Sequence, residues 1–92
     1  MNEIPITVTI CERPYKLMVR PDDEPLIREA AEKINEQVRS YAKNYAFKDN
    51  QDLLSMVSLQ YTLSALRNEK SIAYRDRELL EKLRQIDSSL SL

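Results

Sequence analysis

The sequence predicts an α+β fold in which an N-terminal β-hairpin packs on a helix, followed by a long helix that extends into a C-terminal coiled coil. All four prolines lie within the first 25 of the 92 residues, and the chain contains no glycine. The remainder therefore lacks the two residue types that most often end a helix. Apolar residues alternate with period two before residue 20 and recur at helical spacing afterwards. We expect residues 1–66 to form a small ββα head with the start of the long helix, and residues 67–92 to form a coiled-coil arm.

Two strands are predicted near the N-terminus. The first carries Ile4, Ile6, Val8 and Ile10 on one face, and the second repeats the alternation with Tyr15, Leu17 and Val19. The four residues Cys11–Pro14 between them are expected to form the turn of a hairpin. A lone hairpin is marginally stable in water, so its shared apolar face needs a cover.

The cover is predicted to be a helix over residues 26–45. Its apolar positions form one stripe: Leu26, Ile27, Ala30, Ala31, Ile34, Val38, Tyr41 and Tyr45. The preceding segment Pro21–Pro25 offers acidic N-cap candidates and a proline for the first turn. We interpret the acidic residues 22–24 as helix-capping groups rather than as a metal or catalytic site.

A second helix is expected to begin after a break at residues 44–50, with Asp49 or Asn50 as its N-cap. Between Leu53 and Leu66 its apolar residues cover more than one stripe, so a second subunit is expected to bury part of them. Further along, apolar residues recur at coiled-coil spacing, although the acidic Asp76 interrupts the seam. The predicted oligomer interface comprises Met56, Leu59, Leu63, Leu66, Ile72, Leu79, Leu83, Ile86 and Leu90.

Composition argues against several classes of function. The net charge of −1 gives no broad positive field for nucleic acid or an anionic membrane, and neither a signal peptide nor a membrane span is recognisable. The single cysteine, Cys11, fits a reducing compartment, and without histidine no zinc-type ligand cluster exists. With no glycine-rich phosphate loop and no nucleophile beside a base, we expect a cytoplasmic, non-enzymatic binding protein without cofactor, metal or small-molecule substrate.

The order of elements and several short stretches resemble the bacterial cell-division protein ZapA family. The matching residues are Val8-Thr9-Ile10 with Arg13, Pro21-Asp22-Asp23-Glu24, Leu26 to Ala31 with Ile34-Asn35 and Val38, and Met56-Val57-Ser58-Leu59-Gln60. They span nearly the whole chain. The sequence departs from the family pattern at Glu12, where the family usually has glycine, at Ser58 and Gln60, and in its short C-terminal tail.

The resemblance implies a protein at the midcell division site that binds the tubulin-like division protein FtsZ. It also implies a homodimer that assembles further into a homotetramer, bundles FtsZ protofilaments and promotes assembly and stability of the Z-ring during septation. FtsZ is acidic as a family, so basic residues of the head are candidates for contacting it. The candidates are Arg13 and Lys16 on the hairpin, with Lys43 and Lys48 near the loop between the helices. Arg13 is taken from a position that the family keeps basic, whereas the other three rest on charge and location.

Two other functions fit the same residues. A small dimeric nucleic-acid-binding protein would present Arg13, Lys16, Arg20 and Arg28 to phosphate, and its affinity would fall steeply with salt. A coiled-coil adaptor would tether a different partner and would leave the head without affinity for FtsZ. Identification of the bound protein separates the adaptor from the FtsZ-binding protein.

Overall fold

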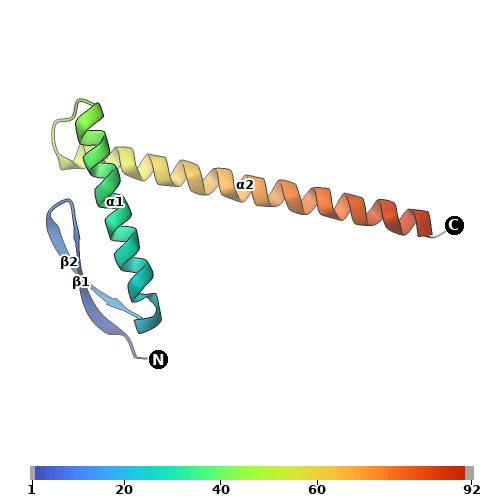
Figure 1. Ribbon diagram of the computed structural model, residues 1–92, viewed down its shortest axis with the longest axis horizontal. Coiled ribbons are helices and arrows are strands. Elements are labelled where there is room, and N and C mark those ends of the chain that lie inside the picture. Colours follow the sequence, from blue (N-terminus) through green and yellow to red (C-terminus); the bar gives the residue numbers. More distant parts are fainter. Residues whose placement is uncertain (1, 91–92) are drawn as a thin grey trace. The chain divides into compact units, whose positions relative to one another are not determined.

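The computed structural model describes residues 2–90, with side chains described for residues 2–86. Two strands, β1 (Ile4–Ile10) and β2 (Arg13–Val19), are followed by a short 3-10 turn, η1 (Pro21–Asp23). Two helices complete the chain, α1 (Glu24–Asn44) and α2 (Asn50–Leu90) (Figure 1). The predicted α+β fold of hairpin, helix and long helix is confirmed.

Internal contacts divide the chain into two units, Met1–Ser58 and Leu59–Leu92. The first unit holds the hairpin, α1 and the first turns of α2. The second consists of the remainder of α2. The expected boundary between a head over residues 1–66 and a coiled-coil arm over residues 67–92 concerns the roles of these segments and stays a prediction.

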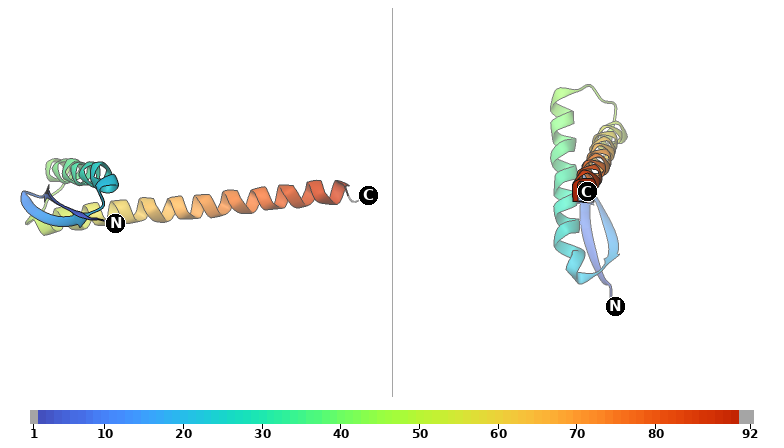
Figure 2. Two further views of the ribbon diagram at one scale, coloured as in Figure 1. Left: turned by 90° about the horizontal axis from the view of Figure 1, so that it is seen from below. Right: turned by 90° about the vertical axis from the view of Figure 1, so that its right-hand side faces the viewer.

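The hairpin is antiparallel, and its register places the predicted apolar residues on one face. Ile6 lies opposite Leu17 and Val8 lies opposite Tyr15. Buried side chains from both strands and from α1 form the core, namely Ile6, Val8, Val19 and Ala31, with Ile4, Ile10 and Ile27 packed against them. Two views show α1 lying along the hairpin (Figures 1 and 2). Because α1 packs mainly on β1, the apolar face of β2 is covered at Val19 but stays open at Tyr15 and Leu17, which are 44% and 38% exposed.

Polar side chains of α1 cover the outer edge of β1. The Arg28 Nη1 donates to the carbonyl oxygen of Thr7 at 3.3 Å, and the Asn35 Nδ2 donates to that of Thr9 at 2.8 Å. These two carbonyls point away from β2, so Lys16 and Pro14 opposite them occupy non-hydrogen-bonded pairs. The missing N–H of Pro14 therefore costs the ladder nothing, which explains how a proline fits inside β2.

The first helix begins differently from the expectation. Asp23 occupies the N-cap position of α1, but no side chain caps this end, and the Asp23 backbone N–H instead donates to the carbonyl oxygen of Arg20 at 2.9 Å. The 3-10 turn η1 leads directly into α1, so the N-cap residue has helical rather than extended dihedral angles. Glu24 forms an ion pair with Arg28 at 3.0 Å, one turn later. The acidic cluster thus contributes an ion pair and negative charge near the helix N-terminus in place of the predicted side-chain cap.

The second helix begins as expected. The Asp52 backbone N–H donates to the Asp49 Oδ1 at 3.2 Å, which is the N-cap bond. The Asp52 carboxylate in turn accepts from the Lys48 backbone N–H at 2.9 Å. The two bonds resemble a capping box and satisfy donors on both sides of the helix start. They anchor α2 at Asn50 after the loop that follows α1.

Candidate functional site

The hairpin turn has two residues rather than the four that were expected. Cys11 and Glu12 have φ values of 50° and 68°, so both occupy the left-handed region, and β2 already begins at Arg13. A two-residue turn of this kind matches the twist of the strands, but it normally uses asparagine or glycine. For residues with a Cβ atom the left-handed region costs about 1–2 kcal/mol each.

A single side chain of α1 holds this turn. The Asn35 Oδ1 accepts a hydrogen bond from the Cys11 backbone N–H at 3.0 Å, while its Nδ2 donates to the Thr9 carbonyl oxygen. The amide therefore links Thr9, in the second-to-last strand pair before the turn, to Cys11, the first residue of the turn. Both bonds use backbone groups that face away from β2, so they offset the cost of the turn without disturbing the ladder.

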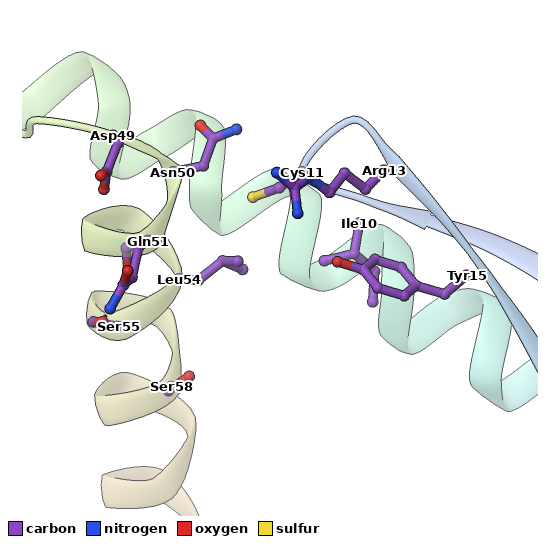
Figure 3. Close-up of a pocket in the computed structure, with 10 residues that line it drawn as sticks. All are labelled: Ile10, Cys11, Arg13, Tyr15, Asp49, Asn50, Gln51, Leu54, Ser55 and Ser58. Carbon is purple, nitrogen blue, oxygen red and sulfur yellow. The ribbon is translucent and has the colours of Figure 1, made fainter.

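An open cavity of about 770 Å³ lies beside the hairpin tip. Hairpin residues line one side of it, and the loop and first turns of α2 line the other (Figure 3). The lining side chains are Ile10, Cys11, Arg13, Tyr15, Asp49, Asn50, Gln51, Leu54, Ser55 and Ser58. Apolar groups on both walls next to one arginine suit a partner that presents an apolar group beside an anionic one.

The structure separates the four basic candidates. Arg13 shares the face of Tyr15 and lines the cavity, whereas the register directs Lys16 to the opposite face of the hairpin. Lys43 lies in the last turn of α1, and Lys48 lies in the loop before α2. All four are exposed, and within residues 2–86 the ion pairs join Arg28 to Glu24 and Lys33 to Glu36 without involving any of the four.

Two residues of this region were not proposed as functional from the sequence. Tyr15 was expected as a core residue of the hairpin, yet it is nearly half exposed and lines the cavity. Asn35 was noted only within a stretch that matches a family. Its position between Ala31 and Val38, on the apolar stripe of the first helix, is the sequence signal for an amide that bonds the covered strand.

The predicted interface residues on α2 are largely uncovered. Leu53 and Val57 are buried and Met56 is half-buried. The interface residues from Leu59 to Ile86 are between 42% and 70% exposed, and this set comprises Leu59, Leu63, Leu66, Ile72, Leu79, Leu83 and Ile86. Leu90 ends α2, and its side chain lies outside the described residues.

These exposed residues form two groups on the second unit. At about 100° per residue, Leu59, Leu63 and Leu66 lie within roughly 60° of one another around the helix. The second group, Ile72, Leu79, Leu83 and Ile86, also spans roughly 60° but is centred on nearly the opposite side. The helix therefore carries two apolar stripes, one near each end of the unit.

The chemistry of the remaining groups is limited. Partial burial raises the pKa of the Cys11 thiol above its ordinary value, and the neighbouring Glu12 carboxylate raises it further. A thiol with a raised pKa is a weaker nucleophile at neutral pH. Within the described residues no cluster of histidine, cysteine, aspartate or glutamate is placed to hold a metal ion. In the same part of the chain, neither helix has a segment long and apolar enough to cross a membrane.

The chain is therefore an α+β protein with an open cavity beside Arg13 and two apolar stripes on α2 that are exposed in the described residues. A family model described as cell division protein ZapA matches residues 6–90, nearly the whole chain. The chain belongs to the ZapA family. It is thus a cell-division protein of a non-enzymatic family that is associated with FtsZ. No curated protein and no solved structure matches the chain.

Proposed function

We propose that this chain forms a homo-oligomer that crosslinks FtsZ protofilaments into bundles at midcell and so promotes assembly of the Z-ring. Family membership supports the association with FtsZ. The observation that carries the crosslinking proposal is the pair of apolar stripes on α2. A chain with two such stripes can join copies of itself twice, and a crosslinker needs at least two filament-binding heads.

The first stripe is the proposed dimer contact. Leu59, Leu63 and Leu66 follow a spacing of four and three residues, which is the spacing of a coiled-coil seam. Each leucine fully buried contributes about 1.5–3 kcal/mol relative to an exposed one. The three side chains are 70%, 42% and 48% exposed, so burying the remaining area in both copies supplies about 5–10 kcal/mol. This is comparable to the cost of association, so the stripe is proposed as a major part of the dimer contact rather than as all of it.

The second stripe is the proposed contact between dimers. Ile72, Leu79, Leu83 and Ile86 lie in the part of α2 that is richest in charged residues. Because this stripe faces nearly away from the first, one helix can serve both contacts without competition. Antiparallel joining of two dimers through this stripe would give a homotetramer with heads at both ends.

Such an assembly explains how weak head contacts would produce bundles. A head bound to one filament holds the other heads at a high effective concentration near a neighbouring filament. Neither nucleotide chemistry nor a cofactor is required of the chain.

We propose that the hairpin tip contacts FtsZ and that Arg13 is the principal basic residue of the contact. Arg13 forms no ion pair within residues 2–86 and lies beside apolar surface, the arrangement found at energetic centres of protein interfaces. Lys16 lies on the other face of the hairpin, and Lys43 and Lys48 lie outside the cavity. They are therefore assigned supporting roles in electrostatic attraction.

Co-sedimentation with FtsZ polymers tests the proposal, with electron microscopy of the pellets to detect bundles. We expect the wild-type chain to pellet with FtsZ and to convert single filaments into bundles. Arg13→Glu should weaken pelleting about tenfold or more, because it replaces an attraction by a repulsion at the contact. Lys16→Glu is the matched control, since the same charge reversal on the opposite face should have the smaller effect.

Four results would contradict parts of this proposal. If wild-type protein fails to pellet with FtsZ, the proposed binding to FtsZ is refuted. Pelleting without bundles would leave FtsZ binding and remove the crosslinking step. Equal effects of the two charge reversals would show that the contact is not centred on Arg13. A fluorescent fusion of the wild-type chain that does not concentrate at midcell would refute the proposed location.

A further inference from the structure

We infer that Asn35 is a positioning residue for the FtsZ contact, which it controls through the conformation of the hairpin turn rather than by touching FtsZ. The inference rests on the proposed function of Arg13 and adds a residue from a different element. It assigns to a side chain of α1 the task of fixing where the contact arginine lies.

The hairpin turn needs stabilising contacts from outside because its own two residues disfavour its conformation. Cys11 and Glu12 both have positive φ values, although each carries a Cβ atom that disfavours the left-handed region. The chain has no glycine with which to relieve this cost. Left to local preferences, a Cys-Glu turn would favour other conformations that splay the strands or change their register.

The Asn35 amide supplies these contacts with two hydrogen bonds, one that it accepts and one that it donates. Its oxygen accepts from the Cys11 N–H at 3.0 Å, and its nitrogen donates to the Thr9 carbonyl oxygen at 2.8 Å. Only a side chain with both an acceptor and a donor can form this pair, so aspartate cannot replace asparagine here. With aspartate, a carboxylate oxygen would face the Thr9 carbonyl oxygen and repel it.

The Asn35 side chain is held rigidly because its backbone lies next to the core. Asn35 is one turn beyond Ala31, which is buried against β1, and is itself half-buried. A side chain on such an element places its partners more accurately than a loop residue would.

The conformation of the hairpin turn determines the position of Arg13. Arg13 directly follows Glu12 and opens β2, so any change in the dihedral angles of the turn redirects its side chain. Cys11, Arg13 and Tyr15 together line the hairpin side of the cavity (Figure 3). Loss of the Asn35 bonds would therefore change the surface that meets FtsZ while the core and α2 stay as they are.

The test compares FtsZ co-sedimentation of wild type, Asn35→Leu and Asn35→Asp. We expect both variants to bind roughly five- to tenfold more weakly, the effect of losing one or two hydrogen bonds that hold a contact surface. The matched control is Asn44→Leu, which removes the amide bond from Asn44 Nδ2 to the Ser40 carbonyl oxygen within the same helix. It should bind FtsZ like wild type. Circular dichroism and light scattering check that each variant folds and assembles.

Two further combinations separate positioning from a general loss of structure. Glu12→Gly should restore most of the binding of Asn35→Leu, since glycine adopts the φ of 68° without the Cβ penalty. In an Arg13→Ala background, Asn35→Leu should cause no additional loss, because the two residues act through one contact. Amide hydrogen exchange at Cys11, measured without FtsZ, should be faster in Asn35→Leu than in wild type.

The outcomes distinguish this inference from the proposal beneath it. Failure of wild type to bind FtsZ, or an Arg13→Ala variant that binds normally, would refute the proposed contact. Normal binding by folded Asn35→Leu would refute the positioning role alone. A loss that Glu12→Gly does not restore, or that adds to the loss from Arg13→Ala, would show that Asn35 acts by another route and would equally refute it.

Discussion

Replacement of Leu59 by aspartate is the sharpest test of the proposed dimer. Leu59 is 70% exposed, so its side chain contributes little to the stability of a single chain. If a second copy covers it, burial of that remaining area is worth about 1–2 kcal/mol per leucine, or about 2–4 kcal/mol for both copies of a symmetric dimer. Leu59→Asp forfeits this contribution and adds two carboxylates, whose burial is unfavourable without a partner. The dimer dissociation constant should therefore rise by at least about 30-fold, and by up to about 1,000-fold before the charge is counted.

Sedimentation equilibrium over a range of protein concentrations measures this constant directly, and circular dichroism monitors helix content. The matched control is Ser64→Asp, which adds the same charge to an exposed site about 140° around the helix from Leu59. It should dissociate like wild type. Leu59→Asp that dissociates like its control would refute the dimer contact, and a folded wild-type monomer at working concentrations would refute the whole scheme of self-association.

Three other substitutions or conditions test separate parts of the structure. Leu83→Asp should abolish assembly beyond the dimer while leaving the dimer intact; light scattering that shows an unchanged mass would exclude the second stripe as a contact. Asp49→Ala removes the N-cap of α2 and should destabilise the chain by about 1 kcal/mol, which thermal unfolding detects; an unchanged midpoint would mean that this cap contributes nothing. Alkylation of Cys11 should be slower in the folded than in the unfolded protein between neutral pH and pH 9, because the folded state raises the thiol pKa. Equal alkylation rates would refute the shift. The raised pKa also means that the folded state favours the neutral thiol, so the contribution of Cys11 to stability is complete below the pKa of the unfolded state. That contribution is lost as the pH rises through the pKa of the folded state.

Most of the fold could be predicted from the sequence because its signals are local. The alternation of Ile4, Ile6 and Val8 marks a strand with one buried face, and the absence of glycine and proline after residue 25 permits long helices. Asp49 was one of two N-cap candidates that residue type and place indicated, and it forms the cap bond. Each of these features depends on neighbours within a few residues, which a sequence displays directly.

Two features were predicted wrongly, and the first of them depends on a distant residue. A two-residue turn at Cys11 and Glu12 is not favoured by its own sequence, and it forms with hydrogen bonds from Asn35, 24 residues away from Cys11. Side-chain capping of α1 was expected from acidic residues, but the 3-10 turn before the helix removes the extended N-cap geometry that such a bond uses.

The candidate site was predictable only in part for the same reason. Arg13 was proposed as a contact residue from the sequence, and this role stays a prediction. Its place at the start of β2, on the face opposite Lys16, could not be predicted because it depends on the length of the turn. A one-residue change in that length reverses the face of every side chain on β2. The exposure of Tyr15 likewise follows from which strand α1 covers, and this is a tertiary property.

The two edges of the small sheet are protected against uncontrolled pairing with strands of other copies. A bare strand can recruit identical strands without limit and give fibrils of undefined size. Here Arg28 and Asn35 occupy two backbone acceptors along one margin, those of Thr7 and Thr9. The other margin carries Pro14 and Lys16, which obstruct and repel an incoming copy. Growth by strand addition is therefore suppressed at both margins, and the proposed self-association would depend on the finite leucine surfaces of α2 instead.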